Sequence, residues 1–216
     1  MCATNEGLYA KCNVFQPMLV KYSCVKAGYD TVSHPREEAI LDLSDEEALA
    51  TIAKAGTFFS YVAGTILSIM QWNSRYSDLL KTQGLVIDNY LTTLPMRKGL
   101  SSSAAVCVLV ATCFSTVHKL NIVTSDLMEI AYLGEMNTPS QCGRMDQCVA
   151  MGRDTIGVMT FTEKGTSIRP LPVKVPLYFV VADLKSSKDT VAILSSLNKC
   201  YPIPNDENEV YEGWNL

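Results

Sequence analysis

The chain has 216 residues, of which 48% are hydrophobic and 19% charged, a composition typical of a globular protein with a sizeable buried core. Its net charge of −4 at pH 7 offers no basic surface for nucleic acid or for an anionic membrane. Eight cysteines without a C-x-x-C pair, together with two histidines, argue against a zinc site and favour a reduced, cytoplasmic chain.

The first part of the chain predicts strands followed by two helices. Residues 8–25, LYAKCNVFQPMLVKYSCV, mix β-branched, aromatic and alternating polar residues and predict one or two strands. An N-cap at Ser44 with an acidic first turn predicts a helix that ends at Gly56. Residues 58–72 predict a second, more apolar helix. The uncharged stretch 56–74 is interrupted by Thr, Ser, Gln and Asn, so it indicates a buried helix and not a membrane span.

The next elements are a strand and two more helices. Residues 84–95, bounded by Gly and Pro, predict the strand. A helix that is apolar nearly all round, and therefore buried, is predicted over residues 103–120. The run TSDLMEIAYLGEMN predicts the second helix, with Thr124 or Ser125 as its cap.

The last third of the chain predicts two further strands, over residues 156–161 and 177–184. After Asn198 the sequence is polar, contains two prolines and has no sustained period. Strands and helices interleave without a regular β-α-β alternation, which favours an α+β fold over a doubly wound parallel sheet.

The turn KGLSSSAA stands between a predicted strand and a predicted helix. One capping serine is enough to start a helix. The free N–H groups of a helix N-terminus and the helix dipole together make an anion site. Gly99 allows close approach of a ligand, and the serine hydroxyls can add donors to phosphate oxygens or an oxygen ligand to Mg²⁺. By itself, the turn fits a phosphate site and a plain serine cap on a buried helix equally well.

Two common phosphate-binding motifs do not match this turn. Lys98 precedes the glycine, whereas the lysine of a Walker loop follows one and is trailed by Ser or Thr. The three-glycine spacing of a Rossmann fingerprint is also missing.

Two stretches carry a family resemblance. LPMRKGLSSSAA resembles the central motif of the GHMP kinases, the superfamily of galactokinase, homoserine kinase, mevalonate kinase and phosphomevalonate kinase. GEMNTPSQCGRMDQCVAMG, residues 134–152, resembles the galactokinase-like stretch in which an acidic helix residue is followed by Gly-x-Met-Asp-Gln. On these two motifs, in this order, the chain is identified as a member of the superfamily, with a resemblance that covers roughly residues 56–184.

The resemblance implies phosphoryl transfer from ATP with Mg²⁺. It makes Ser103 and Glu135 the magnesium ligands, and Asp146 the catalytic carboxylate that takes or orients the proton of a sugar hydroxyl. The residues implied to bind the nucleotide are Pro95, Lys98, Gly99, Leu100, Ser101, Ser102, Ser103, Ala104 and Ala105. The alternatives are that Glu135 is a solvated helix carboxylate and that Asp146 is a loop aspartate that caps a helix.

The acceptor implied by the resemblance is a small sugar or sugar acid. Galactose, arabinose, glucuronic acid, galacturonic acid and a heptose all fit the motifs. Arg144 stands where galactokinases usually carry an apolar residue, so it either contacts an acidic sugar or forms a surface salt bridge. Lys98 is expected to be an exposed cation beside the phosphates.

The resemblance implies an α+β fold with two parts. Residues 1–175 are expected to form the GHMP kinase N-terminal, ATP-binding domain (ribosomal protein S5 domain 2-like), and residues 176–216 to begin the C-terminal domain. The family's first motif is expected before residue 1 and its Gly-rich third motif after residue 216, as in a kinase truncated at both ends. Two functions stay open, namely a sugar kinase and an inactive relative that binds nucleotide or sugar. We expect these 216 residues alone to be a poor enzyme.

Overall fold

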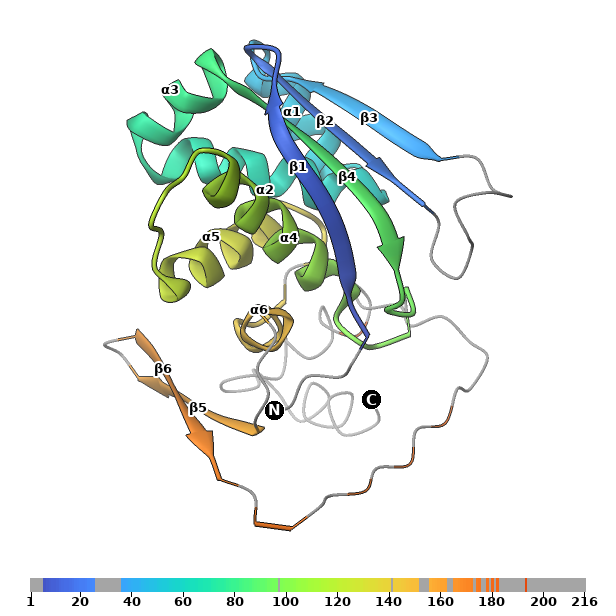
Figure 1. Cartoon of the computed structure of the whole chain (residues 1–216), viewed down its shortest axis with the longest axis vertical. Helices are drawn as coiled ribbons and strands as arrows, with labels where there is room; N and C mark the ends of the chain where they lie inside the picture. The colour runs from blue at the N-terminus through green and yellow to red at the C-terminus, as the bar shows by residue number, and fades with distance from the viewer. Residues whose placement is uncertain are drawn as a thin grey trace, which may run out of the picture.

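Figure 1 shows the computed structural model of the chain. The residues that it describes are 6–25, 36–96, 98–140, 142–151, 156–162 and 165–172, with positions 174, 175, 178, 180, 182 and 193. Helices and strands are both present in these ranges, which confirms the expected α+β class.

A four-stranded mixed sheet, in the order β1-β4-β2-β3, forms one layer of the fold. The bounds of its strands are β1 Leu8–Phe15, β2 Leu19–Cys24, β3 Glu37–Asp42 and β4 Gly84–Thr92. β1 pairs antiparallel with β4 and β2 pairs antiparallel with β3, whereas β2 and β4 run parallel. Parallel neighbours need a crossover, and the segment between them, with β3 and three helices, provides it.

The sequence pattern predicts this sheet in part. The expectation of one or two strands over residues 8–25 is confirmed as two, and the strand predicted from residue 84 ends at Thr92. β3 is not predicted by the pattern. It lies at an edge of the sheet, and Leu41 is the one fully buried residue among its six positions, so the strand lacks a strong apolar alternation.

Six helices lie in the described ranges, and most of them cover one face of the sheet (Figure 1). Their bounds are α1 Glu46–Lys54, α2 Phe58–Trp72, α3 Ser74–Thr82, α4 Ser102–Val117, α5 Thr124–Met136 and α6 Met145–Ala150. α2 has the predicted bounds, and the predicted helices at α1, α4 and α5 are confirmed within a few residues. α3 is not predicted, because its short sequence is polar and Leu80 is its one buried residue.

Two predicted helix caps are wrong. α1 is capped by Asp45, whose side chain accepts from the Ala48 N–H at 2.8 Å, and not by Ser44. The Ser44 hydroxyl is engaged elsewhere, since it donates to the Asp42 carboxylate at 2.6 Å. α5 begins at Thr124, and its N-cap position is Val123, which provides no side-chain cap. In both places the N-cap position lies one or two residues from the predicted one, a shift that sequence patterns do not resolve.

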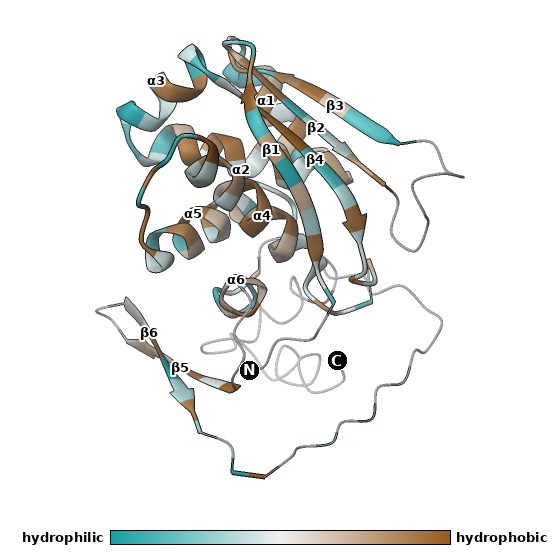
Figure 2. Cartoon of the chain, in the orientation of Figure 1, coloured by the Kyte–Doolittle hydropathy of each residue, from teal (hydrophilic) through white to brown (hydrophobic). Residues whose placement is uncertain are grey.

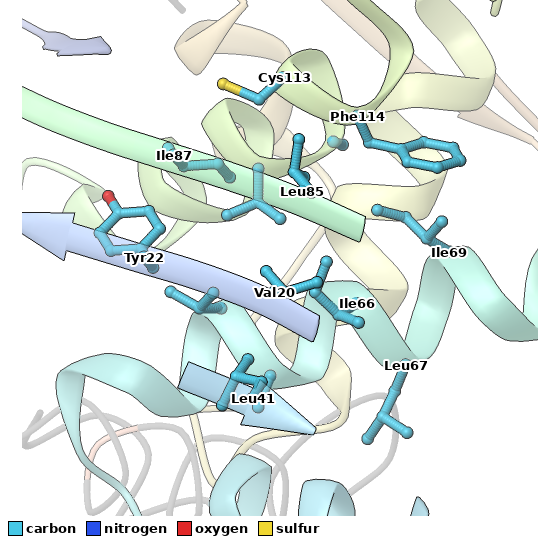
Figure 3. Packing of buried hydrophobic residues seen from close by; sticks show 14 of the residues in the cluster. Val20, Tyr22, Leu41, Ile66, Leu67, Ile69, Leu85, Ile87, Cys113 and Phe114 are labelled. Atoms are coloured by element: carbon cyan, nitrogen blue, oxygen red, sulfur yellow. The ribbon is translucent and has the colours of Figure 1, made fainter. Parts of the chain in front are cut away.

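The hydrophobic core lies between the sheet and the helices. Figure 3 shows Val20 and Tyr22 of β2 beside Leu85 and Ile87 of β4, with side chains of α2 and α4 packed against them. Hydrophobic residues make up much of α2 and α4, as the colouring of Figure 2 shows. Burial of these side chains supplies the main stabilisation and fixes where α4 and α5 lie.

The α2–α5 crossing is unusually close because glycines stand on both helices. A Cβ at Gly64 would run into the carbonyl oxygen of Gly134, and a Cβ at Gly134 would lie 2.6 Å from Thr65 Oγ1. The amide of Asn137 adds a hydrogen bond to the Gly64 carbonyl at 3.1 Å. This contact fixes the C-terminal turn of α5, which carries Glu135.

A two-stranded antiparallel hairpin, β5 Ile156–Thr162 and β6 Gly165–Leu171, follows the helices. β5 confirms the strand predicted over residues 156–161. The strand predicted over residues 177–184, the polar tail after Asn198 and the expected second domain fall almost wholly outside the described residues. Within the described ranges, no helix combines the length and apolar character needed to cross a membrane.

Candidate active site

The serine turn leads from the end of β4 into α4 and has an unusual backbone. Gly99 has φ 78°, and Ser101, at the N-cap position, has φ 54° in the left-handed region. A non-glycine residue rarely takes that conformation, so the turn holds local strain. The Ser101 side chain does not cap the helix, although its carbonyl accepts the Ala105 N–H at 3.1 Å. The first N–H groups of α4 therefore donate no hydrogen bond to an N-cap side chain.

The turn itself is open to solvent on its N-terminal side. Pro95, Lys98, Gly99 and Leu100 are exposed, the three serines and Ala105 are half-buried, and Ala104 is buried. This gradient gives a ligand access to the turn while the small residues let α4 enter the core directly behind it. Such an arrangement suits the phosphates of a nucleotide.

Glu135 lies behind the turn and is almost completely buried, with 1% of its surface exposed. Burial raises the pKa of its carboxyl, and the negative charge of Asp146 acts in the same direction. Hydrogen bonds from the Ser103, Cys142 and Gln147 side chains oppose that rise in pKa. A buried carboxylate with neutral donors around it is a strong candidate for a cation ligand, because a cation offsets the cost of burying its charge.

The structure therefore brings together three predicted site residues from three helices. Ser103 belongs to the first turn of α4, Glu135 to the last turn of α5 and Asp146 to the first turn of α6. The short α6 packs against both α4 and α5. Asp146 is half-buried, so its carboxylate stays accessible at the side of the buried Glu135.

The loop between α5 and α6 is held by its own hydrogen bonds. Thr138 donates from its N–H and its hydroxyl to the Glu135 carbonyl, at 2.9 and 2.7 Å. The Ser140 N–H donates to the Thr138 hydroxyl at 3.2 Å, and its own hydroxyl lies 2.9 Å from the Tyr61 hydroxyl on α2. These bonds hold the backbone that directly follows Glu135.

Arg144, for which two roles were open, engages α5. Its Nε and Nη2 donate to the two carboxylate oxygens of Glu129 at 3.0 and 2.9 Å. Its guanidinium also lies over the Tyr132 ring, 4.1 Å from the ring centroid. The structure thus contains the salt bridge, and this pair joins the start of α6 to α5.

Gln147 and Cys142 complete the site, and sequence reasoning missed both. The Gln147 Nε2 donates to Glu135 Oε2 at 2.9 Å and to Cys142 Sγ at 3.3 Å. Gln147 is fully buried, and among the described residues its Oε1 has no hydrogen-bond partner. The signal was its place directly after Asp146 in the GRMDQ run, but nothing in the run itself says which way the side chain turns.

The donor set around Glu135 fits Mg²⁺. Mg²⁺ prefers a few hard oxygen ligands from the protein and takes waters and phosphates for the rest. Ser103 supplies a hydroxyl and Glu135 a carboxylate, and the orphaned Gln147 Oε1 beside them is a further acceptor without a donor. No group of three or more His, Cys, Asp or Glu side chains that could hold a metal ion occurs in the described part of the chain.

Comparison with known proteins gives two matches. Residues 60–153 match the GHMP kinases N terminal domain, a range that contains the serine turn, Glu135 and Asp146. A galactokinase from Roseiflexus sp. (strain RS-1) is 28% identical over an alignment that covers 79% of this chain and 42% of the galactokinase. The chain thus spans less than half the length of that relative. Both matches support the GHMP kinase superfamily and its galactokinase-like branch, in agreement with the two sequence motifs.

Proposed function

We propose that this chain carries the phosphate-binding and metal-binding part of an ATP-dependent kinase that phosphorylates the anomeric hydroxyl of a sugar or sugar acid. The observation that carries the proposal is the gathering of Ser103, Glu135 and Asp146 at the N-terminus of α4. Phosphoryl transfer needs a phosphate cradle, a cation and a group that positions the attacking hydroxyl. The family match and the galactokinase relative support this reaction class.

In this proposal the serine turn binds the triphosphate of ATP. The exposed residues Pro95, Lys98, Gly99 and Leu100 meet the nucleotide, and the N–H groups at the start of α4 face its phosphate oxygens. The left-handed backbone at Gly99 and Ser101 supports this assignment, because strain of that kind collects at ligand sites. Lys98 adds an exposed positive charge beside the phosphates.

Ser103 and Glu135 hold Mg²⁺ in this proposal. When bound, the ion neutralises phosphate charge during transfer. The burial of Glu135 excludes bulk water from this side of the site, so the electrostatic interactions there are strong.

Asp146 is the proposed catalytic carboxylate. It accepts the proton of the sugar hydroxyl while the hydroxyl oxygen bonds to the γ-phosphorus and the bond to the bridging oxygen of ADP breaks. Its half-buried position supports this role, since a sugar must reach it from solvent. The proposal assigns residues 1–175 to the ATP-binding domain and residues 176–216 to the start of a second domain.

We base the proposed class of acceptor and the proposed cytoplasmic location on net charge and on the cysteines. The net charge of −4 favours a small-molecule acceptor over nucleic acid. Within the described part of the chain no cysteine is in a disulfide, which is compatible with the reducing conditions of the cytoplasm.

The test measures transfer of labelled γ-phosphate from ATP to a panel of neutral and acidic sugars, in a protein that also carries the family's first and third motifs. We expect phosphorylation of one class of sugar, and we expect Asp146→Asn to lower turnover by about 10²- to 10⁴-fold while ATP and the sugar still bind. Near-normal turnover in Asp146→Asn would show that Asp146 is not the catalytic base. Nucleotide or sugar binding without any transfer in the unaltered protein would favour the inactive, binding relative.

A further inference from the structure

Gln147 is the residue at the site whose hydrogen bonding is incomplete. It has no exposed surface, its Nε2 reaches Glu135 Oε2 at 2.9 Å, and its Oε1 has no partner among the described residues. A buried acceptor without a donor destabilises the fold, because it has given up its hydrogen bonds to water and gained none in return. Proteins keep such groups rarely, so the arrangement calls for an explanation in terms of a ligand.

The orientation of the amide is fixed by its neighbours. Exchanging its oxygen and nitrogen would turn Oε1 toward the Glu135 carboxylate, where two acceptors would meet without a proton between them. Nε2 must therefore face Glu135 and Cys142, and Oε1 must face away from them. Gln147 Oε1 is left without a partner because the Glu135 carboxylate takes the donor end of the same amide.

Resting on the proposed function above, we propose that Gln147 is a positioning residue for the metal ligand Glu135. Its N–H holds Oε2 of the carboxylate and so sets the orientation that Glu135 offers to the cation. Its Oε1 accepts from a donor that arrives with the hydrated cation, such as a metal-bound water. Gln147 acts through Glu135 and does not itself ligate the ion.

If Gln147 served only to join α6 to α5, another contact could do the same. α5 and α6 are already joined by the bidentate pair of Arg144 and Glu129, which is partly exposed. Glu129→Gln weakens that tie without touching the buried network, so it is the matched control. Loss of cation affinity in a Gln147 variant but not in Glu129→Gln separates orientation of the metal ligand from loosening of α6.

The experiment titrates Mn²⁺ against the protein with a non-hydrolysable ATP analogue and follows free Mn²⁺ by electron paramagnetic resonance. Gln147→Met keeps the length of the side chain and removes both its donor and its acceptor. We expect it to weaken Mn²⁺ binding by about 10- to 100-fold, as is typical when a partner of a metal ligand is lost. Turnover is expected to recover at saturating Mg²⁺, and Glu129→Gln should bind Mn²⁺ as the unaltered protein does.

Gln147→Asn, which keeps the amide but shortens its reach, gives a second titration and decides the matter if the Met variant does not fold. Unchanged Mn²⁺ affinity in a folded variant overturns the inference. So does a fall in turnover at unchanged affinity, because Gln147 would then act on Asp146. If the unaltered protein takes up no Mn²⁺ beside the nucleotide analogue, the proposed function and this inference both fall.

Discussion

Gly64 of α2 and Gly134 of α5 face each other where the two helices cross, with no room for a Cβ on either residue. Gly134 directly precedes Glu135, so the contact that brings the helices together also sets the position of the proposed metal ligand. The neighbours at Gly134 are the backbone and side chain of Thr65, which cannot move without shifting α2.

Gly134→Ala is therefore expected to destabilise the fold. The added methyl group would force the helices apart, at a cost of about 1–3 kcal/mol or more. Denaturant unfolding measures this free energy. Gly143→Ala is the matched control, since a Cβ there meets nothing within 4 Å. Equal stability of the two variants would show that the α2–α5 contact is looser than described.

The elements that the sequence predicts well are those whose pattern is strong over a long stretch. α2 has ten buried residues among fifteen, and the nearly all-apolar α4 follows a clear turn signal. The elements it misses have weak patterns, because β3 and α3 each contain a single buried residue. α3 did carry one usable signal, since Asn73 caps it by accepting from the Tyr76 N–H at 2.9 Å.

The residues of the candidate site likewise fall into those that the sequence predicts and those that it does not. The serine turn, Glu135 and Asp146 are predicted as site residues because they stand in two motifs that resemble those of the GHMP kinases. Gln147 and Cys142 do not follow, because their roles depend on how α6 is rotated against α5. The choice between two roles for Arg144 likewise depends on Glu129, which lies fifteen positions earlier and meets it only in the fold.

Ser103→Ala is expected to weaken the use of magnesium and ATP. The change removes a proposed ligand and also one donor to the Glu135 carboxylate. The Mg²⁺ concentration for half-maximal activity should rise by about 10-fold or more, judged by the loss typical for partners of metal ligands. Thr116→Ala is the control, since that hydroxyl bonds to the Thr112 carbonyl near the far end of the same helix. Unchanged kinetics at limiting Mg²⁺ would count decisively against the assignment of Ser103.

Arg144 is expected to act through Glu129 and not through the substrate. In a double-mutant cycle with Arg144→Met and Glu129→Gln, the coupling free energy should be about 0.3–1 kcal/mol, a low value because 43% and 34% of the two side chains are exposed. Arg144→Met should leave the ratio of KM values for acidic and neutral sugars unchanged. A selective rise in KM for an acidic sugar would mean that Arg144 contacts the acceptor after all.

His118 is expected to make stability depend on pH near neutrality. Its ring packs on Phe114 with centroids 4.9 Å apart, and within the described residues both of its ring nitrogens are buried without a hydrogen-bond partner. Burial lowers its pKa below the usual value near 6.5. As the pH falls below about 6.5, the unfolded chain therefore takes up a proton that the folded chain does not. Stability is full above that pH and decreases on acidification until the folded pKa is reached.

His118→Phe keeps an aromatic ring against Phe114 and removes the titration. The difference in unfolding free energy between this variant and the unaltered protein should be flat above about pH 7 and should grow below about pH 6.5 in favour of the variant. Its slope should be a fraction of the limiting value of about 1.4 kcal/mol per pH unit, because the ring is only half-buried. Carboxylates titrate in both proteins and cancel in the difference. Urea unfolding at a series of pH values measures it, and a difference independent of pH would show that His118 can accept its proton in the folded protein.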